Sequence, residues 1–160
     1  MGIKCQTSAK DIDEFLKKAA RLIQEYMLRA LTKLGEECIV KIRDRGAQES
    51  WIDHTGNLRS SVGYSVYDYG VKYMQSSFAT VLGGSKGRSE GMRMVNELAQ
   101  EYSNVFALVV VAAMDYAAYV EAIESKDVLE STRIWAQSVV EQRLNRAKEE
   151  AIKVINTWKL

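Results

Sequence analysis

The sequence predicts a single α+β domain, in which a small antiparallel sheet packs against a long N-terminal helix and a long C-terminal helix. Apolar residues recur every three or four positions over residues 9–46 and again over residues 127–158, which is the periodicity of an amphipathic helix. Short runs rich in Val, Tyr and Ser lie between these stretches, within residues 51–123, and such runs are typical of strands. The chain has 160 residues, which is the size of one domain. It contains no proline, which would mark linkers or broken elements, so we predict one domain spanning residues 1–160.

The first helix is expected over residues 9–46, with Ser8 as its N-cap and Gly46 at its end. Such a helix would be roughly 50 Å long at about 1.5 Å per residue, which exceeds the core of a domain this small. We therefore expect it either to kink near Gly35 or to pack part of its length on a neighbouring subunit. Its apolar stripe comprises Ile12, Leu16, Ala19, Ile23, Met27, Ala30, Leu34, Cys38 and Ile42.

The sheet is predicted from three runs. Residues 62–68 and 71–79 are expected to form a hairpin, because Asp68-Tyr69-Gly70 between them has the composition of a tight turn. Residues 105–112 are continuously apolar, which indicates a central strand covered on both faces. Residues 115–123 are amphipathic, but they are too few to distinguish a helix from a strand.

Helical spacing returns in residues 92–102 and again in the last helix, residues 127–158. The start of the last helix has two interpretations. Asp127 followed by Glu130 resembles a capping box, whereas Ser131 is a rival N-cap.

Residues 83–91, which read GGSKGRSEG, are the low-complexity stretch of the chain and predict a flexible loop. With Lys86 and Arg88 in this loop and Arg93 just beyond it, two functions are open. The loop orders against a neighbouring subunit, or it contacts nucleic-acid phosphates electrostatically. A plain exposed loop is as good an interpretation as these two together, because loops of this composition are usually just mobile.

Composition argues against several classes of protein. Hydrophobic residues make up 47% of the chain and charged residues 27%, which is ordinary for a globular protein, and a net charge of +1 does not by itself predict a nucleic-acid partner. No apolar run is long enough to cross a bilayer, so we expect no membrane partner. Cys5, Cys38 and the single histidine, His54, cannot complete a tetrahedral zinc site without carboxylates, so no metal or cofactor is expected.

No motif for catalysis is found, and we predict that the protein is not an enzyme. His54 is the one candidate base, but its neighbour Asp53 points elsewhere in most backbone conformations, and a polar loop histidine is the simpler interpretation. Acidic side chains cluster before the last helix, where the helix dipole attracts them regardless of function. These acidic residues are Asp115, Glu121, Glu124, Asp127 and Glu130.

Aromatic residues crowd the predicted hairpin, and cross-strand packing explains most of them. Tyr67 and Tyr69 are nevertheless candidates for an interface. Trp51 and Trp158 are candidate interface anchors, because tryptophan is enriched at binding hot spots, and core packing is an equal alternative for both. The complete set of predicted interface residues is Trp51, Tyr67, Tyr69, Lys86, Arg88, Arg93 and Trp158.

An ordered series of segments is similar to a known family. It comprises Thr55-Gly56-Asn57-Leu58-Arg59-Ser60-Ser61 leading into Val62-Gly63-Tyr64, the Gly-rich stretch, Ala107-Leu108-Val109-Val110-Val111-Ala112-Ala113-Met114, Asp115-Tyr116-Ala117-Ala118-Tyr119-Val120-Glu121, and Asp127-Val128-Leu129. Over about residues 51–144 the chain resembles the tail-component family encoded beside the head–tail joining genes of lambda-like and related long-tailed phages. Its members are described as minor tail, tail-completion or neck proteins. They often have glycine shortly after the Val-Glu pair, where this chain has Ala122-Ile123-Glu124-Ser125.

The resemblance implies a small antiparallel sheet with a long helix packed on it, and a homo-oligomeric ring, which we expect to be a hexamer. It places the protein in the virion, at the neck or the head-proximal end of the tail, after synthesis in the bacterial host cytoplasm. The expected partners are neighbouring neck, connector or tail-tube proteins, with a passing contact to genomic DNA. The resemblance carries over no catalytic residues.

Two alternatives to this assembly role remain. The first is a small nucleic-acid-binding accessory protein, in which the basic residues of the Gly-rich loop and the hairpin tyrosines grip DNA. The second is a small hydrolase that uses His54 or the acidic cluster.

Overall fold

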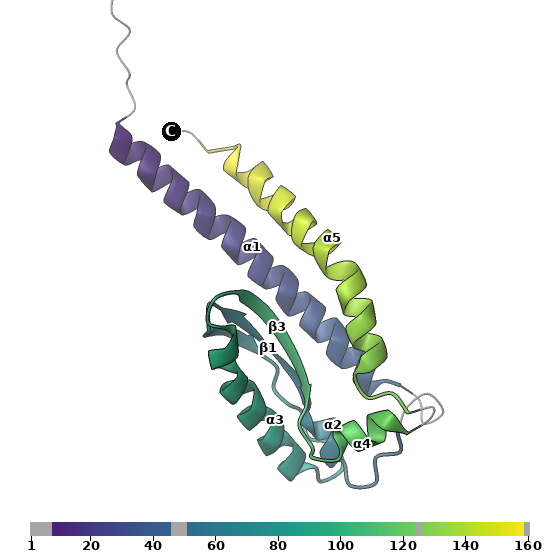
Figure 1. The fold of residues 1–160 in the computed structure, drawn as a ribbon. Helices are drawn as coiled ribbons and strands as arrows, with labels where there is room; N and C mark the ends of the chain where they lie inside the picture. Colours follow the sequence, from purple (N-terminus) through teal and green to yellow (C-terminus); the bar gives the residue numbers. More distant parts are fainter. Residues whose placement is uncertain (1–7, 46–50, 124–125, 159–160) are drawn as a thin grey trace, which may run out of the picture.

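The computed structural model describes residues 8–45, 51–123 and 126–158, and it confirms the α+β architecture. Figure 1 shows a sheet seen close to edge-on between one short helix and one long helix, with a second long helix running back alongside the first. The elements are, in chain order, α1 (Ala9–Arg43), α2 (Asn57–Ser61), β1 (Val62–Asp68), β2 (Val71–Gln75), α3 (Ser85–Leu98), the 3-10 turn η1 (Ala99–Tyr102), β3 (Phe106–Ala112), α4 (Ala117–Ala122) and α5 (Glu130–Ile155). The sheet therefore lies between α3 and α1, and α5 widens the layer that contains α1.

The predicted cap at the start of α1 is confirmed. The Asp11 amide donates to Ser8 Oγ and the Ser8 amide donates to Asp11 Oδ2, both at 3.1 Å, which forms a capping box. The kink expected near Gly35 is wrong, because α1 continues as one helix to Arg43. Gly35 instead permits close packing, since a Cβ atom there would lie 2.5 Å from the Tyr64 ring. The expected end of the helix at residue 46 lies outside the described residues.

The N-terminal part of α1 extends beyond the sheet and pairs with the C-terminal part of α5 (Figure 1). The Phe15 ring meets Trp158 edge-on, with 5.8 Å between the ring centroids, and Lys18 Nζ lies 4.3 Å from the Trp158 ring centroid. Closer to the sheet, both guanidinium Nη atoms of Arg143 bind the Glu37 carboxylate at 2.6 and 2.7 Å. A helix of the same chain therefore covers the part of α1 that is too long for the core.

The sheet has the strand order β2-β1-β3, and both strand pairs are antiparallel. The predicted hairpin is confirmed, although β2 ends at Gln75 rather than residue 79. Its two-residue turn has positive φ at both positions, 49° at Tyr69 and 81° at Gly70. Such a turn matches the right-handed twist of the flanking strands, which is why it joins them so tightly.

The prediction that residues 105–112 form a central strand is wrong, because β3 lies at an edge of the sheet and β1 at its centre. Burial alternates along β3, whereas six of the seven β1 residues are buried. The polar groups of β1 tolerate burial because they find partners. Ser65 Oγ donates to the Met74 carbonyl at 3.0 Å, and the Tyr67 hydroxyl donates to the Val95 carbonyl.

The flexible loop predicted for residues 83–91 is also wrong, because α3 begins at Ser85 and continues to Leu98. The glycines serve close packing rather than mobility. A Cβ atom at Gly87 would overlap the carbonyl of Asn57, and one at Gly91 would overlap the ring of Phe78. The short segment that sequence could not assign is a helix, α4.

Candidate interaction surface

The segment that resembles the phage family, residues 55–61, folds into α2 and the turn before it, where its polar groups bind the protein's own backbone. Gly56 has a φ of 74°, a left-handed conformation that favours glycine. The Asp53 carboxylate accepts hydrogen bonds from the amides of Gly56 and Arg59, at 2.8 and 3.1 Å. Asp53 thereby satisfies amides at the start of α2 that have no partner within the helix.

Two further side chains of this segment join it to other elements. Asn57 Oδ1 accepts a hydrogen bond from the Gly87 amide of α3 at 3.2 Å. Ser61 Oγ accepts one from the Ala113 amide, just after β3, at 3.1 Å. The segment therefore connects α2 to α3 and to the end of the sheet.

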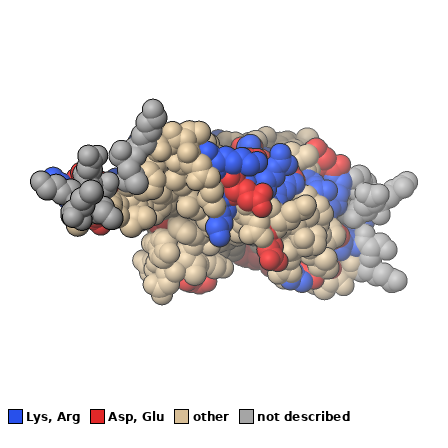
Figure 2. Space-filling view, turned by 90° about the horizontal axis from the view of Figure 1, so that it is seen from above, with Lys and Arg blue, Asp and Glu red and all other residues tan. Residues whose placement is uncertain are grey.

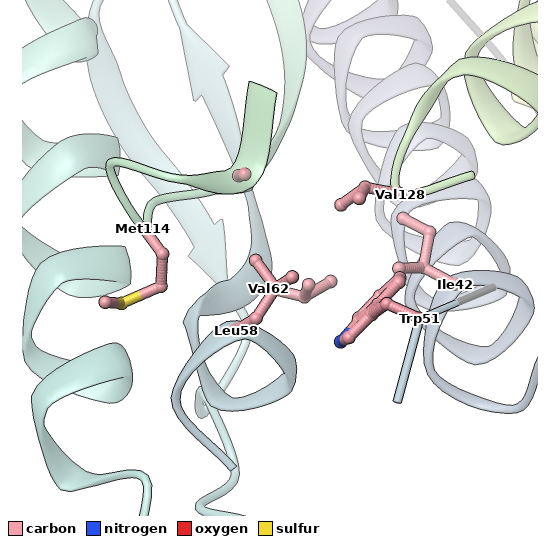
Figure 3. Close-up of a cluster of buried hydrophobic side chains, with 7 residues drawn as sticks. Ile42, Trp51, Leu58, Val62, Met114 and Val128 are labelled. Carbon is pink, nitrogen blue, oxygen red and sulfur yellow. The ribbon is translucent and has the colours of Figure 1, made fainter. Parts of the chain in front are cut away.

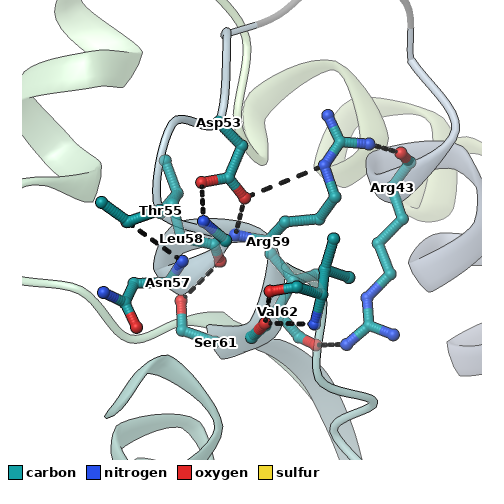
Figure 4. A network of polar contacts seen from close by, with 11 residues as sticks. Arg43, Asp53, Thr55, Asn57, Leu58, Arg59, Ser61 and Val62 are labelled. Carbon is teal, nitrogen blue, oxygen red and sulfur yellow. Dashed lines mark hydrogen bonds and ion pairs between the residues drawn. The ribbon is translucent and has the colours of Figure 1, made fainter. Parts of the chain in front are cut away.

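Two arginines hold the same segment against the end of α1 (Figure 4). Arg59 Nη1 donates to the carbonyl oxygen of Arg43, and Arg43 Nη2 donates to the Val62 carbonyl at 2.6 Å. The Arg59 guanidinium also lies 5.4 Å from the centroid of the Trp51 ring, within the range of a cation–π contact. Burial, reinforced by the nearby Arg59 charge, lowers the pKa of Arg43. This cluster joins α1, α2 and β1.

Glu121 of α4 holds the start of α5. Its carboxylate accepts hydrogen bonds from three consecutive amides, those of residues 128–130, at 3.1, 2.7 and 3.1 Å. The first amides of a helix have no partner within the helix, so this carboxylate supplies what they lack. Of the two predicted caps, the Asp127–Glu130 box does not form, and Ser131 donates its amide to Asp127 Oδ1 at 3.2 Å rather than capping the helix.

Arg45 fixes the same junction from the other side. Arg45 Nη1 lies 2.6 Å from Asp127 Oδ2, and the same nitrogen donates to the Asp127 carbonyl at 3.0 Å. Arg45 Nη2 donates to Thr132 Oγ1. Burial alone would raise the pKa of Asp127, but hydrogen bonds from Ser131 and the pairing with Arg45 together lower it.

Several of the acidic residues near His54 and α5 bind the protein's own backbone or an arginine. Both oxygens of Asp53 accept backbone hydrogen bonds, so this carboxylate is not available to orient the exposed His54. Glu121 and Asp127 are engaged at the start of α5. Among the described residues no three His, Cys, Asp or Glu side chains lie close enough to hold a metal ion, and Glu124 lies outside that set.

Two of the predicted interface residues lie in the core. Trp51 is 5% exposed and packs beside Ile42 and Val128 (Figure 3). Tyr67 is fully buried, and its hydroxyl binds the Val95 carbonyl. Core packing, the equal alternative for Trp51, therefore describes its ring within this chain, and Tyr67 fills the core in the same way. Contact of either residue with a partner stays a prediction.

Tyr69 and Trp158 do reach the surface. Tyr69 is 56% exposed at the hairpin turn, where its ring meets Phe106 edge-on at a centroid distance of 4.9 Å. Trp158 is half-buried on Phe15 at the tip of the α1–α5 pair. Contact of either residue with a partner stays a prediction.

Lys86, Arg88 and Arg93 lie on the exposed side of α3 rather than on a loop. Arg93 is bound by Glu90 at 2.8 Å and Glu97 at 2.7 Å, so its charge is largely compensated. On the face shown in Figure 2, basic and acidic side chains lie next to one another rather than forming a field of one sign. That face therefore does not favour contact with a phosphate backbone.

The structure contains an apolar groove that the sequence analysis missed. It has a volume of about 560 Å³ and is bounded by α1, β3 and α5. Leu31 and Leu34 of α1, Leu108 and Val110 of β3, and Val140 of α5 are among its lining residues. The groove runs beside the outer edge of β3, which pairs with no other strand of the described sheet. Three segments far apart in sequence create it, so no local pattern could have located it.

The opposite edge of the sheet is open as well. The side chains of β2 are exposed on both faces of the sheet, with exposed fractions of 70% for Val71, 37% for Tyr73 and 44% for Met74. Unpaired edge strands with apolar side chains are prone to pair with another chain.

Comparisons with family models, curated proteins and solved structures found no match to this chain. None of the described helices is both long enough and apolar enough to cross a membrane.

Proposed function

We propose that this chain is a structural virion protein of a tailed phage or prophage, forming a ring at the head–tail interface or at the head-proximal end of the tail. One observation carries the proposal. Asp53, Arg59 and Glu121 lie in or next to the segments that resemble the phage family. Their side chains bind the protein's own backbone and connect its helices and strands, instead of forming a reactive cluster. Surfaces, rather than reactive groups, are then what the molecule offers to its surroundings.

The two open edges of the sheet suit a ring. A subunit of a ring contacts one neighbour through one patch and the other neighbour through a different patch. The β2 edge and the groove beside β3 are two such patches, and they lie on opposite sides of β1. The expected number of six copies rests on the family resemblance alone.

Electron microscopy of the purified protein and mass spectrometry of purified particles together test the proposal. We expect rings with a uniform number of subunits, and the protein present in mature particles at a copy number that matches the ring. Deleting its gene should leave heads and tails that fail to join, and supplying the gene in trans should restore joining. Infectious particles that form normally without the protein would exclude the proposed function.

The alternative, a nucleic-acid-binding accessory protein, has one observation in its favour, because Lys86 and Arg88 are both exposed at the start of α3. It predicts that the protein retards DNA at low salt and that the double replacement Lys86→Ala and Arg88→Ala abolishes the shift. Replacing Arg93, whose charge is compensated by two glutamates, is the matched control. The ring proposal instead expects no retardation by the unmodified protein.

A further inference from the structure

We propose that the groove beside β3 receives strand β2 of a second copy of this chain, so that neighbouring sheets join into one sheet around the ring. The inference rests on the proposed function, because it specifies the contact through which ring subunits meet. It follows from the chemistry of the groove, from the exposure of β2 and from the strand directions.

The groove is suited to an extended strand. Along one wall, the outer edge of β3 presents backbone N–H and C=O groups that no strand of the described sheet pairs. The floor and the other wall are mostly apolar, with Leu31, Leu34 and Val140 among their side chains. An occupant must therefore supply backbone hydrogen bonds along one edge and apolar side chains beneath. A helix uses its backbone groups internally and a small apolar molecule has none, whereas an added strand meets both needs.

Strand β2 has the matching properties. Met74 lies opposite Val66, which packs on α1, and Val71 lies opposite Asp68 on the same face of the sheet. Yet both β2 side chains are largely exposed. The helices reach β2 through polar side chains, such as Asn96 of α3, which accepts a hydrogen bond from Lys72 at 2.6 Å. At the β3 edge of the sheet, α5 lines the groove, and no strand of the described sheet lies between α5 and this edge.

The two edges of the sheet thus have complementary properties. At one edge the apolar side chains of β2 are exposed, and at the other edge α5 lines the groove beside β3. When β2 of the next copy enters the groove, Val71 and Met74 cover the part of α5 that remains accessible beside the half-buried Val140 and Leu144. Each copy supplies one exposed strand and one groove, so the same contact repeats from copy to copy.

The strand directions determine how the copies pair. Strands β2 and β3 are both antiparallel to β1, so they run in the same direction. If the ring axis runs parallel to the strands, rotation about it leaves the strand direction and the position along the axis unchanged from one copy to the next. The new pair is therefore parallel, with Met74 of one copy level with Leu108 of the next, because both residues lie opposite Val66 within one chain.

The available area sets the strength of this contact. An unfolded chain exposes roughly 160 Å² per residue, so the exposed fractions of Tyr69, Val71, Tyr73 and Met74 correspond to roughly 330 Å². A stable interface usually buries about 800 Å² on each partner. The strand contact is smaller than this, so covalent trapping is the most direct way to detect it.

Cysteine pairs provide that trap. Within one chain β2 and β3 are separated by β1, so their Cα atoms lie about 9.6 Å apart, whereas a disulfide needs about 4.4–6.8 Å. A disulfide between Met74→Cys and Leu108→Cys must consequently join two copies. Cys5→Ser removes one native thiol, and Cys38 stays in place because it is buried and burial raises its pKa to about 11.

We expect the oxidised double variant to form a ladder of multimers on non-reducing gels that collapses on reduction. Each single variant, the matched control, should remain monomeric because the contact joins two different edges. Two further cysteine pairs, Met74→Cys with Phe106→Cys and Met74→Cys with Val110→Cys, allow for a shift of the strand register. If electron microscopy shows rings but none of the three pairs gives a ladder, the strand contact is wrong and the ring proposal still stands. A ladder from a protein that particles do not contain would uphold the contact and refute the virion role.

A second variant tests the same contact without altering the core. Val71→Lys places a charge on a side chain that is 70% exposed, so the fold should be unaffected while ring formation is lost. Leu82→Lys, at a residue that is 72% exposed outside β2, is the matched control and should leave rings intact. Undiminished rings from Val71→Lys would contradict the proposed contact.

Discussion

The glycines of α3 are points of contact between the helix and its neighbours. Gly87 faces the carbonyl of Asn57, and Gly91 faces the ring of Phe78, each too closely to leave room for a side chain. Glycine is a poor helix former, so its use in a helix interior indicates that close approach outweighs propensity here.

Replacing Gly87 with alanine should therefore destabilise the protein. Alanine favours the helix by about 1 kcal/mol, but overlap with the Asn57 backbone should cost more, for a net loss of about 1–3 kcal/mol. Urea unfolding followed by circular dichroism measures the change. Ser89→Ala, at an exposed position of the same helix, is the control and should be neutral or slightly stabilising. A Gly87→Ala protein as stable as the control would show that the contact is loose.

The start of α5 depends on a side chain from another element. We expect Glu121→Ala to lower the free energy of unfolding by about 1–2 kcal/mol, because three amides lose their acceptor. Glu121→Gln should lose less, because it retains an acceptor oxygen. Hydrogen exchange at residues 128–130 reports the local effect, and Glu149→Ala on the exposed side of α5 is the control. Unchanged exchange in Glu121→Ala would contradict the capping role.

The Glu37–Arg143 pair makes the docking of α5 on α1 dependent on pH. The hydrogen bonds from Arg143 lower the pKa of Glu37 below its ordinary value of 4.5. A lowered pKa in the folded state stabilises the protein above the unfolded pKa, and this contribution is lost as the pH falls through the folded pKa. Both side chains are more than a third exposed, so we expect only about 0.5–1 kcal/mol.

Thermal unfolding of the native protein and the Glu37→Gln variant measures this dependence. The difference in stability between the two proteins should be largest near about pH 6 and should vanish towards about pH 3. Glu141→Gln, which changes an exposed residue of α5, is the control and should show no such convergence. A difference that stays constant across this range would exclude the ion pair as its source.

The elements predicted correctly from sequence are those whose signals are local. The Ser8 cap and the turn at Tyr69-Gly70 act within a few residues, and both predictions are confirmed. The predicted apolar stripe of α1 is confirmed only at Leu34, Cys38 and Ile42, because Ile12 and Leu16 are exposed and Leu28 and Leu31 are buried in their stead. The errors arise where distant contacts decide. The position of β3 depends on which strand pairs with β1, and the helix at Ser85–Leu98 depends on packing against α2.

The candidate surface was less predictable than the fold. Residue type alone selected Trp51 and Tyr67, which are buried, because large aromatic side chains are common both in cores and at interfaces. The groove is formed by α1, β3 and α5, and the exposure of β2 depends on which elements pack near it. Both are properties of the whole molecule, and no window of sequence contains them.

At the scale of the whole molecule, the tip of the α1–α5 pair is the part farthest from the core. We expect Trp158→Ala to free Phe15 and accelerate hydrogen exchange in the first turns of α1, while exchange over residues 28–42 stays unchanged. Global stability should fall by less than about 2 kcal/mol, because a tip can fray without unfolding the sheet. Uniform acceleration along α1 would instead indicate that the helical pair unfolds as one unit.

The order β2-β1-β3 also has a consequence for folding. The hairpin of β1 and β2 closes over two residues, whereas β3 reaches β1 only after the chain has passed through α3. Contacts between distant segments form slowly, so the hairpin should form early and wait for β3 to arrive. During that interval β1 has an unpaired side in the nascent chain. We expect Gly63 and Ser65 to make this strand a poorer template for aggregation during that interval, because glycine and serine weaken strand pairing between chains.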